Sequence, residues 1–167
     1  MARRIVMACD GGANTGIVVL ALDGSSYPEL LGYHTVKTSP KDRPVTRYEQ
    51  IFGAVTFAIR RFCPEAMATE QPLSWLRNGV PLLWMLVGAS MGAAMAEGCP
   101  LHVIGAPTRH KRGRKWILTG LKTKEKARKE CERYFGKKIA KDMGEHCCDA
   151  VMMAIWCFSQ LPPEEKK

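Results

Sequence analysis

The sequence predicts an α/β domain built on a five-stranded mixed sheet, in which a three-strand meander is joined to two crossover strands with helices on both faces. Three short apolar runs come first, as in a hairpin meander. After them, apolar runs alternate with longer segments of helical periodicity. The chain has 167 residues, of which 46% are hydrophobic and 25% charged. This fits one globular domain, which we expect over residues 1–161, followed by a short charged tail over 162–167.

Each expected strand is a short apolar run bounded by turn residues or by an acid. The run RIVMAC at residues 4–9 ends at Asp10, and the sequence GGAN that follows is typical of a turn. The remaining strands are expected at 15–23, 30–38, 66–70 and 101–104. Because the last two follow helical segments, we expect them to enter the sheet by crossover connections, which makes the sheet mixed.

Four segments have helical patterns. Pro44 opens one whose apolar residues recur at helical spacing as far as Phe62. The others are expected at 81–97, 123–135 and 144–161. The segment 78–96 carries no charge and approaches the length of a membrane span, but its second half is Gly, Ala, Ser and Met. We therefore interpret it as a buried helix whose small residues let another element pack closely.

The charge balance indicates an acidic partner. Lys and Arg number 25 against 16 Asp and Glu, giving a formal net charge of +9. Such a basic domain usually meets nucleic acid, anionic lipid or an acidic protein, although charge also serves solubility alone.

The seven cysteines are odd in number, irregularly spaced and without a C-x-x-C pair. This is typical of reduced thiols rather than a disulfide framework. The start of the chain also lacks the apolar region of a signal peptide. We therefore expect a cytoplasmic protein that is not secreted.

Acidic residues stand where catalytic groups of α/β proteins gather. Asp10 and Glu70 follow apolar strands, and the carboxyl ends of strands are where sites form. His146 and Asp149 are three residues apart on one face of the last expected helix. All four converge if that helix packs beside the first strand. Taken singly, a strand-end acid is more often a turn residue, and a His-x-x-Asp pair is more often helix capping.

A cluster of carboxylates predicts a metal site, because the charges repel unless a cation joins them. Oxygen ligands suit Mg²⁺ or Mn²⁺, and two such ions can clamp the attacking water and the leaving oxygen of a phosphodiester. A basic protein with this site is typical of a nuclease.

Three motifs in order resemble the RuvC-type Holliday junction resolvases, a branch of the RNase H-like (retroviral-integrase) nuclease superfamily. The sequence DGGANTG at 10–16 is similar to the family's first-strand acid and glycine-rich turn. Glu70-Gln71 is similar to its Glu-Gln, and HCCDA at 146–150 to its closing acid-or-His, two residues and Asp-Ala. The similarity covers residues 4–158, and the chain could be a viral member of the family. The resemblance implies association with the nucleoid or, if the source is viral, action in the host cytoplasm.

The resemblance implies an RNase H-like fold and a crossover-junction endodeoxyribonuclease that makes paired symmetric nicks. It implies two Mg²⁺ ions per site, with Mn²⁺ as substitute, held by Asp10, Glu70 and Asp149. His146 is the implied fourth catalytic and metal-binding group, able to ligate a metal or pass a proton.

The resemblance also implies contacts with branched DNA and a homodimer. The expected DNA-binding residues are Arg109, Lys111, Arg112, Arg114, Lys115, Lys124 and Trp75. Trp75 could instead lie in the core or in a dimer contact. A two-fold junction needs two matched cuts, which favours a symmetric dimer, implied to form through the helix at 81–97. Candidate contacts on that helix are Met85, Ser90, Met91 and Ala94.

Other interpretations stay open. The same site could serve a broader flap or fork nuclease, or the fold could bind junctions without cutting them. Residues 10–16 could be the phosphate loop of a sugar-kinase or actin-like ATPase, but that class needs two such domains. A zinc site from His146, Cys147 and Cys148 is disfavoured, because adjacent helical residues point about 100° apart.

Overall fold

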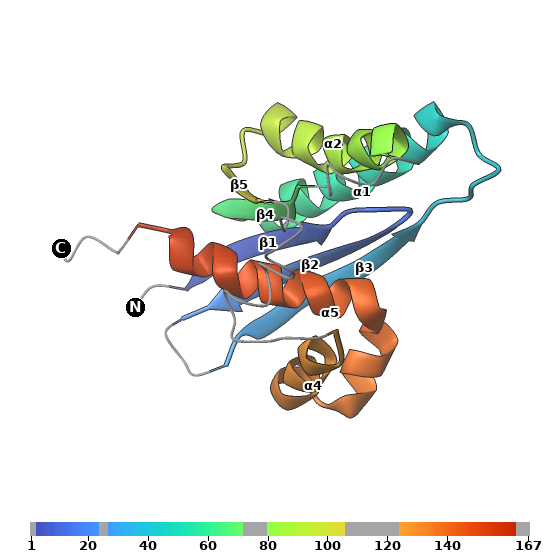
Figure 1. Cartoon of the computed structure of the whole chain (residues 1–167). Helices are drawn as coiled ribbons and strands as arrows, with labels where there is room; N and C mark the ends of the chain where they lie inside the picture. Colours follow the sequence, from blue (N-terminus) through green and yellow to red (C-terminus); the bar gives the residue numbers. More distant parts are fainter. Residues whose placement is uncertain (1–2, 24–26, 72–79, 106–123, 163–167) are drawn as a thin grey trace.

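A computed structural model describes residues 3–23, 27–71, 80–105 and 124–162 (Figure 1). Its strands are β1 (Arg4–Asp10), β2 (Asn14–Leu22), β3 (Glu29–Lys37), β4 (Ala66–Glu70) and β5 (Leu101–Ile104). Its helices are α1 (Pro44–Phe62), α2 (Val80–Ala96), α4 (Lys124–Phe135) and α5 (Lys137–Gln160). Every strand expected from the sequence is present, with ends that differ by one residue at most from the expected ones, and the helices at 44–62, 81–97 and 123–135 are confirmed equally closely.

The five strands form one mixed sheet in the order β3-β2-β1-β4-β5. β1, β2 and β3 are an antiparallel meander, and β4 and β5 are parallel to their neighbours. This confirms the predicted combination of a meander with crossover strands. β1 is central, so its carboxyl end lies in the middle of one edge of the sheet.

Helices cover both faces of the sheet, with α1 and α2 on one and α4 and α5 on the other (Figure 1). Alternate residues of a strand point to opposite faces. Met7 and Cys9 therefore pack in the core under α1 and α2, while Val6 and Ala8 pack under α5. Because the middle of β1 is buried from both sides, the strand is apolar from Ile5 to Cys9 and turns polar at Asp10.

The last helix is longer than the sequence predicts. The expected helix at 144–161 is the longer, C-terminal part of α5. The helix begins at Lys137 and changes direction at Gly144. Gly144 has φ 70 and ψ −179, a conformation that only glycine adopts readily. The sequence did not predict the part of α5 before Gly144, because a segment as short and as charged as residues 137–143 shows no helical period. The break places His146 and Asp149 at the start of the buried half.

α2 packs against α1, and its buried residues include Leu86, Val87, Ala89 and Ala93. This confirms the expected buried helix. Within the described part of the chain, no helix combines the length and apolarity that a membrane crossing requires.

Candidate functional site

The acids Asp10 and Glu70 lie side by side at one edge of the sheet. β1 and β4 are parallel neighbours, and their register pairs Cys9 with Thr69. Asp10 and Glu70 are the next residues on the two strands, so they follow this pair at the carboxyl edge. The buried Thr69 hydroxyl donates to the carbonyl of Cys9 at 3.2 Å and ties the strand ends together.

The turn after Asp10 is held by side chains of threonine. The buried Thr15 hydroxyl donates to the carbonyl of Gly12 at 3.0 Å and accepts from the amide of Gly12 at 3.3 Å. Both the amide and the hydroxyl of Thr38 donate to the carbonyl of Ala13, at 3.0 and 2.9 Å. The glycine-rich segment is thus a fixed support for Asp10.

His146 reaches Asp10 because α5 crosses the sheet in close contact with β2. Gly16 pairs with Asp10 across the two strands. A Cβ atom on Gly16 would lie 2.4 Å from the carbonyl carbon and oxygen of His146, so only glycine lets the main chain of α5 come this near. In this position Nδ1 of His146 lies 3.0 Å from Oδ2 of Asp10. The Asp10 side chain is 13% exposed and that of His146 37%, so solvent reaches the pair from the imidazole side.

Asp149 follows His146 by one helical turn and is 1% exposed. It belongs to the part of α5 that packs on β1, β2 and β4. The edge of the sheet thus carries two strand-end acids, and the helix above it carries His146 and Asp149. α5 packs beside β1, which is the condition on which the expected convergence of the four residues depends.

The cysteines beside the site point elsewhere. Cys147 Sγ lies 3.2 Å from the Thr35 hydroxyl and 3.4 Å from the carbonyl oxygen of His34, toward β3. Burial raises the pKa of the Cys147 thiol above its ordinary range. Cys148 Sγ faces the carbonyl of Ala140 at 3.7 Å within the core. These opposed directions argue against a zinc site that includes both thiols.

The structure joins Asp10 directly to His146. Glu70 ends the strand next to β1, and Asp149 lies one helical turn after His146. Among the residues it describes, no three His, Cys, Asp or Glu side chains are close enough to form a metal-binding group. Of the expected DNA contacts, Lys124 is the first residue of α4. Its side chain lies outside the described part of the chain, as do Trp75, Arg109, Lys111, Arg112, Arg114 and Lys115.

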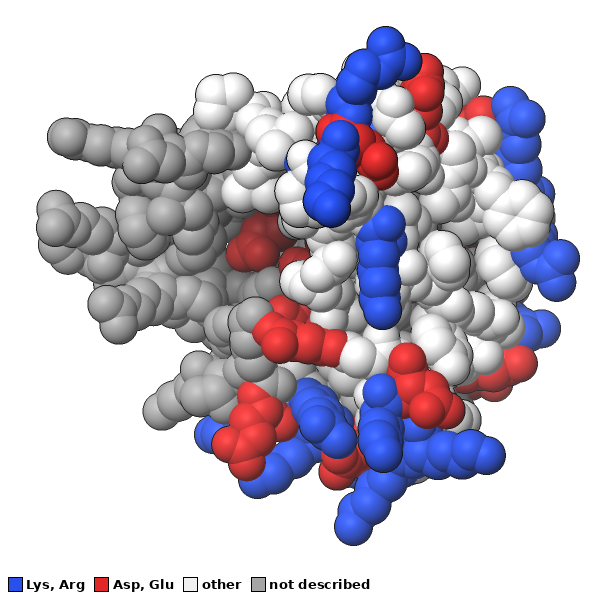
Figure 2. All heavy atoms as spheres, turned by 90° about the vertical axis from the view of Figure 1, so that its right-hand side faces the viewer, with Lys and Arg blue, Asp and Glu red and all other residues white. Residues whose placement is uncertain are grey.

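Two lysines near the site were not singled out from the sequence. Lys37 and Lys141 line a polar cavity of about 470 Å³ that also contains His146 and Asn14. They come from β3 and from the first half of α5, and no sequence pattern connects them. Figure 2 shows this end of the molecule, where Lys and Arg side chains are interspersed with Asp and Glu side chains.

The sheet order, the helices on both faces and the strand-end acids define the RNase H-like class of proteins. Within this class the chain is similar to RuvC in sequence and in structure, as comparison with known proteins shows. No family model matches the chain. The crossover junction endodeoxyribonuclease RuvC of two Thermus thermophilus strains is 32% identical over 106 residues, which cover 60% of this chain and 63% of RuvC. The match therefore spans less than two thirds of these relatives.

Solved structures extend the similarity over the whole fold. T. thermophilus RuvC in complex with a Holliday junction substrate superimposes with a TM-score of 0.75 and 26% identity, covering 91% of both chains. A further T. thermophilus RuvC structure gives 0.74 and 28%, covering 91% of this chain and 92% of that one. The yeast mitochondrial Holliday junction resolvase Ydc2 has a TM-score of 0.62 at 12% identity, covering 90% of this chain and 76% of that one, which shows the fold alone.

Proposed function

We propose that this protein is a metal-dependent endonuclease that resolves four-way DNA junctions by paired symmetric nicks. The observation that carries the proposal is the contact between Asp10 and His146 at the carboxyl edge of β1. It occurs in a fold that matches RuvC bound to a Holliday junction over 91% of the chain. The net charge of +9 suits a phosphate-rich substrate.

The donor atoms at the site fit hard divalent cations. Asp10, Glu70 and Asp149 offer carboxylate oxygens, and His146 offers an imidazole nitrogen, a combination that suits Mg²⁺ or Mn²⁺. We assign these four residues to the metal and catalytic site. Bound ions there supply electrostatic stabilisation of the phosphodiester and a more acidic water.

We propose that His146 acts through Nε2, the ring nitrogen that does not contact Asp10. When Nδ1–H donates to the Asp10 carboxylate, Nε2 carries the lone pair and can accept a proton or bind a cation. The Asp10 carboxylate also fixes the plane of the ring. This contact therefore orients the imidazole for either role.

We propose that basic residues hold the DNA, namely Arg109, Lys111, Arg112, Arg114, Lys115 and Lys124, with Trp75 stacking on a base. Lys37 and Lys141, which line the cavity next to His146, add to these contacts. Because phosphate contacts release counterions, junction binding should weaken steeply as salt concentration rises.

We further propose a symmetric homodimer through α2, so that one active site meets each of two strands. The structure restricts which residues can take part. Ser90 and Ala94 are completely buried within the chain, so these two candidates cannot meet a partner. Met95, 74% exposed, lies on the side of α2 that remains accessible, and we assign it to the dimer contact.

A nicking assay tests the proposed function. End-labelled four-way junction, flap and linear duplex are each incubated with Mg²⁺, Mn²⁺ or EDTA. The wild type should nick the junction symmetrically, and both EDTA and Asp10→Asn should abolish the cuts. Glu29→Gln is the matched control, because Glu29 is exposed and begins β3 at the end of the strand far from the site.

The other outcomes are distinct. Equal cutting of flaps and forks would keep the site and replace the substrate with branched DNA in general. Tight junction binding without cleavage by the wild type would show a binding protein and overturn the proposed activity.

A further inference from the structure

The polar cavity that contains Lys37 and Lys141 adjoins the proposed catalytic site. It has a volume of about 470 Å³ and lies between β3 and the first part of α5. His146, whose Nδ1 lies 3.0 Å from Oδ2 of Asp10, is part of its lining. Cavities of about 300–1,000 Å³ are typical of small-ligand sites. A DNA strand with a phosphate at Asp10 and His146 therefore has this cavity beside its neighbouring nucleotide.

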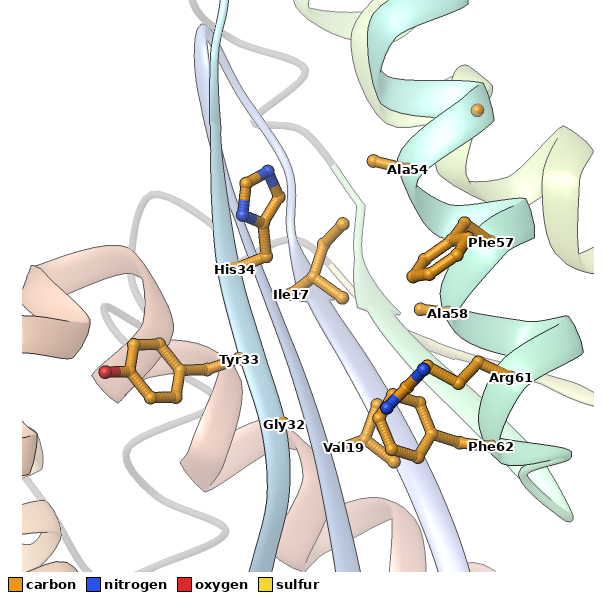
Figure 3. A pocket seen from close by; sticks show the side chains of 11 residues that line it. Ile17, Val19, Gly32, Tyr33, His34, Ala54, Phe57, Ala58, Arg61 and Phe62 are labelled. Atoms are coloured by element: carbon orange, nitrogen blue, oxygen red, sulfur yellow. The ribbon is translucent and has the colours of Figure 1, made fainter.

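One wall of the cavity is a row of alternate residues of β3, namely Tyr33, Thr35 and Lys37. The pairing of this stretch with β2 is regular, so the three side chains point to the same face of the sheet. The Thr35 hydroxyl lies 3.2 Å from Sγ of Cys147, which identifies this face as the one that α5 covers. Figure 3 shows Tyr33 pointing away from α1, in agreement with this placement.

The ring of Tyr33 is available to a ligand. The residue is 42% exposed, and within the described part of the chain no aromatic ring or cation packs on it. An exposed aromatic ring beside a polar cavity offers a flat surface on which a nucleobase can stack.

Two lysines line the cavity from opposite walls. Lys37 comes from β3 and Lys141 from the part of α5 before Gly144, and both are exposed. Neither forms an ion pair with any residue that the structure describes. Two ammonium groups without a carboxylate partner at one cavity suit a phosphate.

Acids line the cavity as well, so it is not a simple anion site. These are Asp142 and Glu145 of α5. A nucleotide suits both kinds of charge, because its phosphate accepts hydrogen bonds from lysine, while the amino groups of adenine, cytosine and guanine donate to carboxylates. Position then selects a nucleotide over other ligands of mixed charge, since the cavity adjoins the residues to which we assign DNA cleavage.

We propose that this cavity holds the nucleotide next to the scissile phosphate, with its base unpaired and stacked on Tyr33 and its own phosphate bound by Lys37 and Lys141. The inference rests on the proposed nuclease function and names a part of its substrate. Tyr33 is distinct from Trp75, which follows β4 in the sequence.

The proposal makes Tyr33 a residue that selects branched DNA. A base reaches the ring only after it has left its neighbours in the duplex, and this costs free energy. The cost is lowest where the base is already unpaired, as it can be at a branch point. A continuous duplex has to be opened first, so the cavity favours a branched substrate.

A double-mutant cycle between protein and DNA tests the contact. Single-turnover cleavage of a four-way junction is measured at sub-saturating protein. Tyr33→Ala should lower the rate about tenfold, and Tyr33→Phe should keep it, because the phenyl ring stacks equally well. An abasic nucleotide is placed in turn on each side of the scissile phosphate. At one of the two positions it should slow the wild type about tenfold and slow Tyr33→Ala no further.

Junction binding in EDTA, followed by fluorescence anisotropy, tests the lysines without cleavage. Lys37→Gln and Lys141→Gln should each lower the slope of log K against log salt concentration by about 1. Lys138→Gln is the matched control, an exposed lysine of α5 that does not line the cavity. Tyr27→Ala, an exposed tyrosine just before β3, is the control for Tyr33→Ala. Circular dichroism checks that each variant is folded.

The outcomes separate this inference from the proposed nuclease function. If the wild type cuts junctions but the losses from Tyr33→Ala and the abasic nucleotide multiply at both positions, the cavity does not hold the base, although the nuclease function stands. Binding that depends on the lysines but not on the base would leave a phosphate contact only and would overturn the stacking role of Tyr33. If the wild type cuts nothing, the proposed function fails, and the same cycle measured on junction binding in EDTA decides whether the cavity holds a base.

Discussion

Gly16 lies directly against the main chain of His146, although 130 residues separate them in the sequence: a Cβ atom on Gly16 would be 2.4 Å from the carbonyl carbon of His146. Gly16 also pairs with Asp10 across β1 and β2. One glycine therefore sets how closely α5 approaches the sheet at the point where its imidazole meets the strand-end acid. The contact links packing to the geometry of the proposed site.

Gly16→Ala should lose both stability and cleavage. The clash is with main chain, which cannot rotate away, so α5 must move from β2 and take His146 from Asp10. Overpacking of this kind costs about 1–3 kcal/mol in the free energy of unfolding. We expect a lower urea midpoint and junction cleavage reduced by about tenfold or more under conditions where the variant is still folded.

Gly53→Ala is the matched control for stability. Gly53 lies inside α1, and a Cβ atom there meets nothing within 4 Å. Alanine should therefore stabilise the protein by about 0.5–1 kcal/mol, because it favours the helix over the unfolded chain. Equal urea midpoints for the two variants would contradict the role assigned to Gly16.

The sequence predicts the sheet because its signals are local. Residues 5–9 before Asp10 are all apolar, since β1 is buried on both faces there. Pro44 begins α1, and Pro64 follows its end. The acids Asp10 and Glu70 could be placed at one edge because they end such runs. The contact of Asp10 with His146 could not be derived from local patterns, since it depends on how α5 crosses β2. A glycine within the apolar run of β2 was the available signal for that close approach.

Other features of the site have no local pattern. The start of α5 and its break at Gly144 went unpredicted, because a short charged helical turn looks like a loop. The cavity lysines, Lys37 and Lys141, come from separate elements. Long-range packing brings them together, and one sequence does not reveal it.

His146→Ala should reduce cleavage without preventing folding. The side chain is 37% exposed, so its removal leaves the core intact, but the hydrogen bond between His146 and Asp10 is lost and the site loses its imidazole. Loss of a proton-transfer group typically lowers rates about 10²–10⁴-fold. Single-turnover cleavage of the junction at saturating protein measures this. His102→Ala, which changes a histidine of β5, should cleave at the wild-type rate, and an equal loss in both variants would contradict the assignment.

Arg47→Met should loosen the support of Asp10. Arg47 is 5% exposed, and its Nε donates to the Thr38 hydroxyl at 3.0 Å. That hydroxyl in turn donates to the carbonyl of Ala13, in the turn after Asp10. Methionine keeps much of the length and removes the donor, so the free energy of unfolding should fall by about 1–3 kcal/mol.

Arg43→Met, at an exposed position before α1, serves as the control for this change and should have little effect. Urea denaturation gives both free energies. If Arg47→Met were as stable as Arg43→Met, the hydrogen bonds that link Arg47 through Thr38 to the turn would not contribute to the free energy of unfolding.

Buried thiols should make the protein less stable in alkali. Burial raises the pKa of Cys99 to about 11 and that of Cys157 to about 12, and it also raises the pKa of Cys9. In the unfolded chain these thiols titrate near a pKa of about 8.5. Above that pH the unfolded state releases protons that the folded state keeps. The free energy of unfolding therefore falls as pH rises, by about 1.4 kcal/mol per pH unit for each such thiol until the folded thiol also titrates.

Urea denaturation under reducing conditions at about pH 8 and about pH 10.5 measures the slope, and a variant separates the thiols from the lysines and tyrosines that titrate in the same range. Cys157→Ala removes one buried thiol, so its stability should be lower at pH 8 but should decline less between the two pH values. Cys63→Ala removes an exposed thiol and should decline as the wild type does. If all three proteins declined in parallel, burial of Cys157 would contribute nothing to the alkaline loss, since only a thiol protonated more strongly in the folded state can produce a difference in slope.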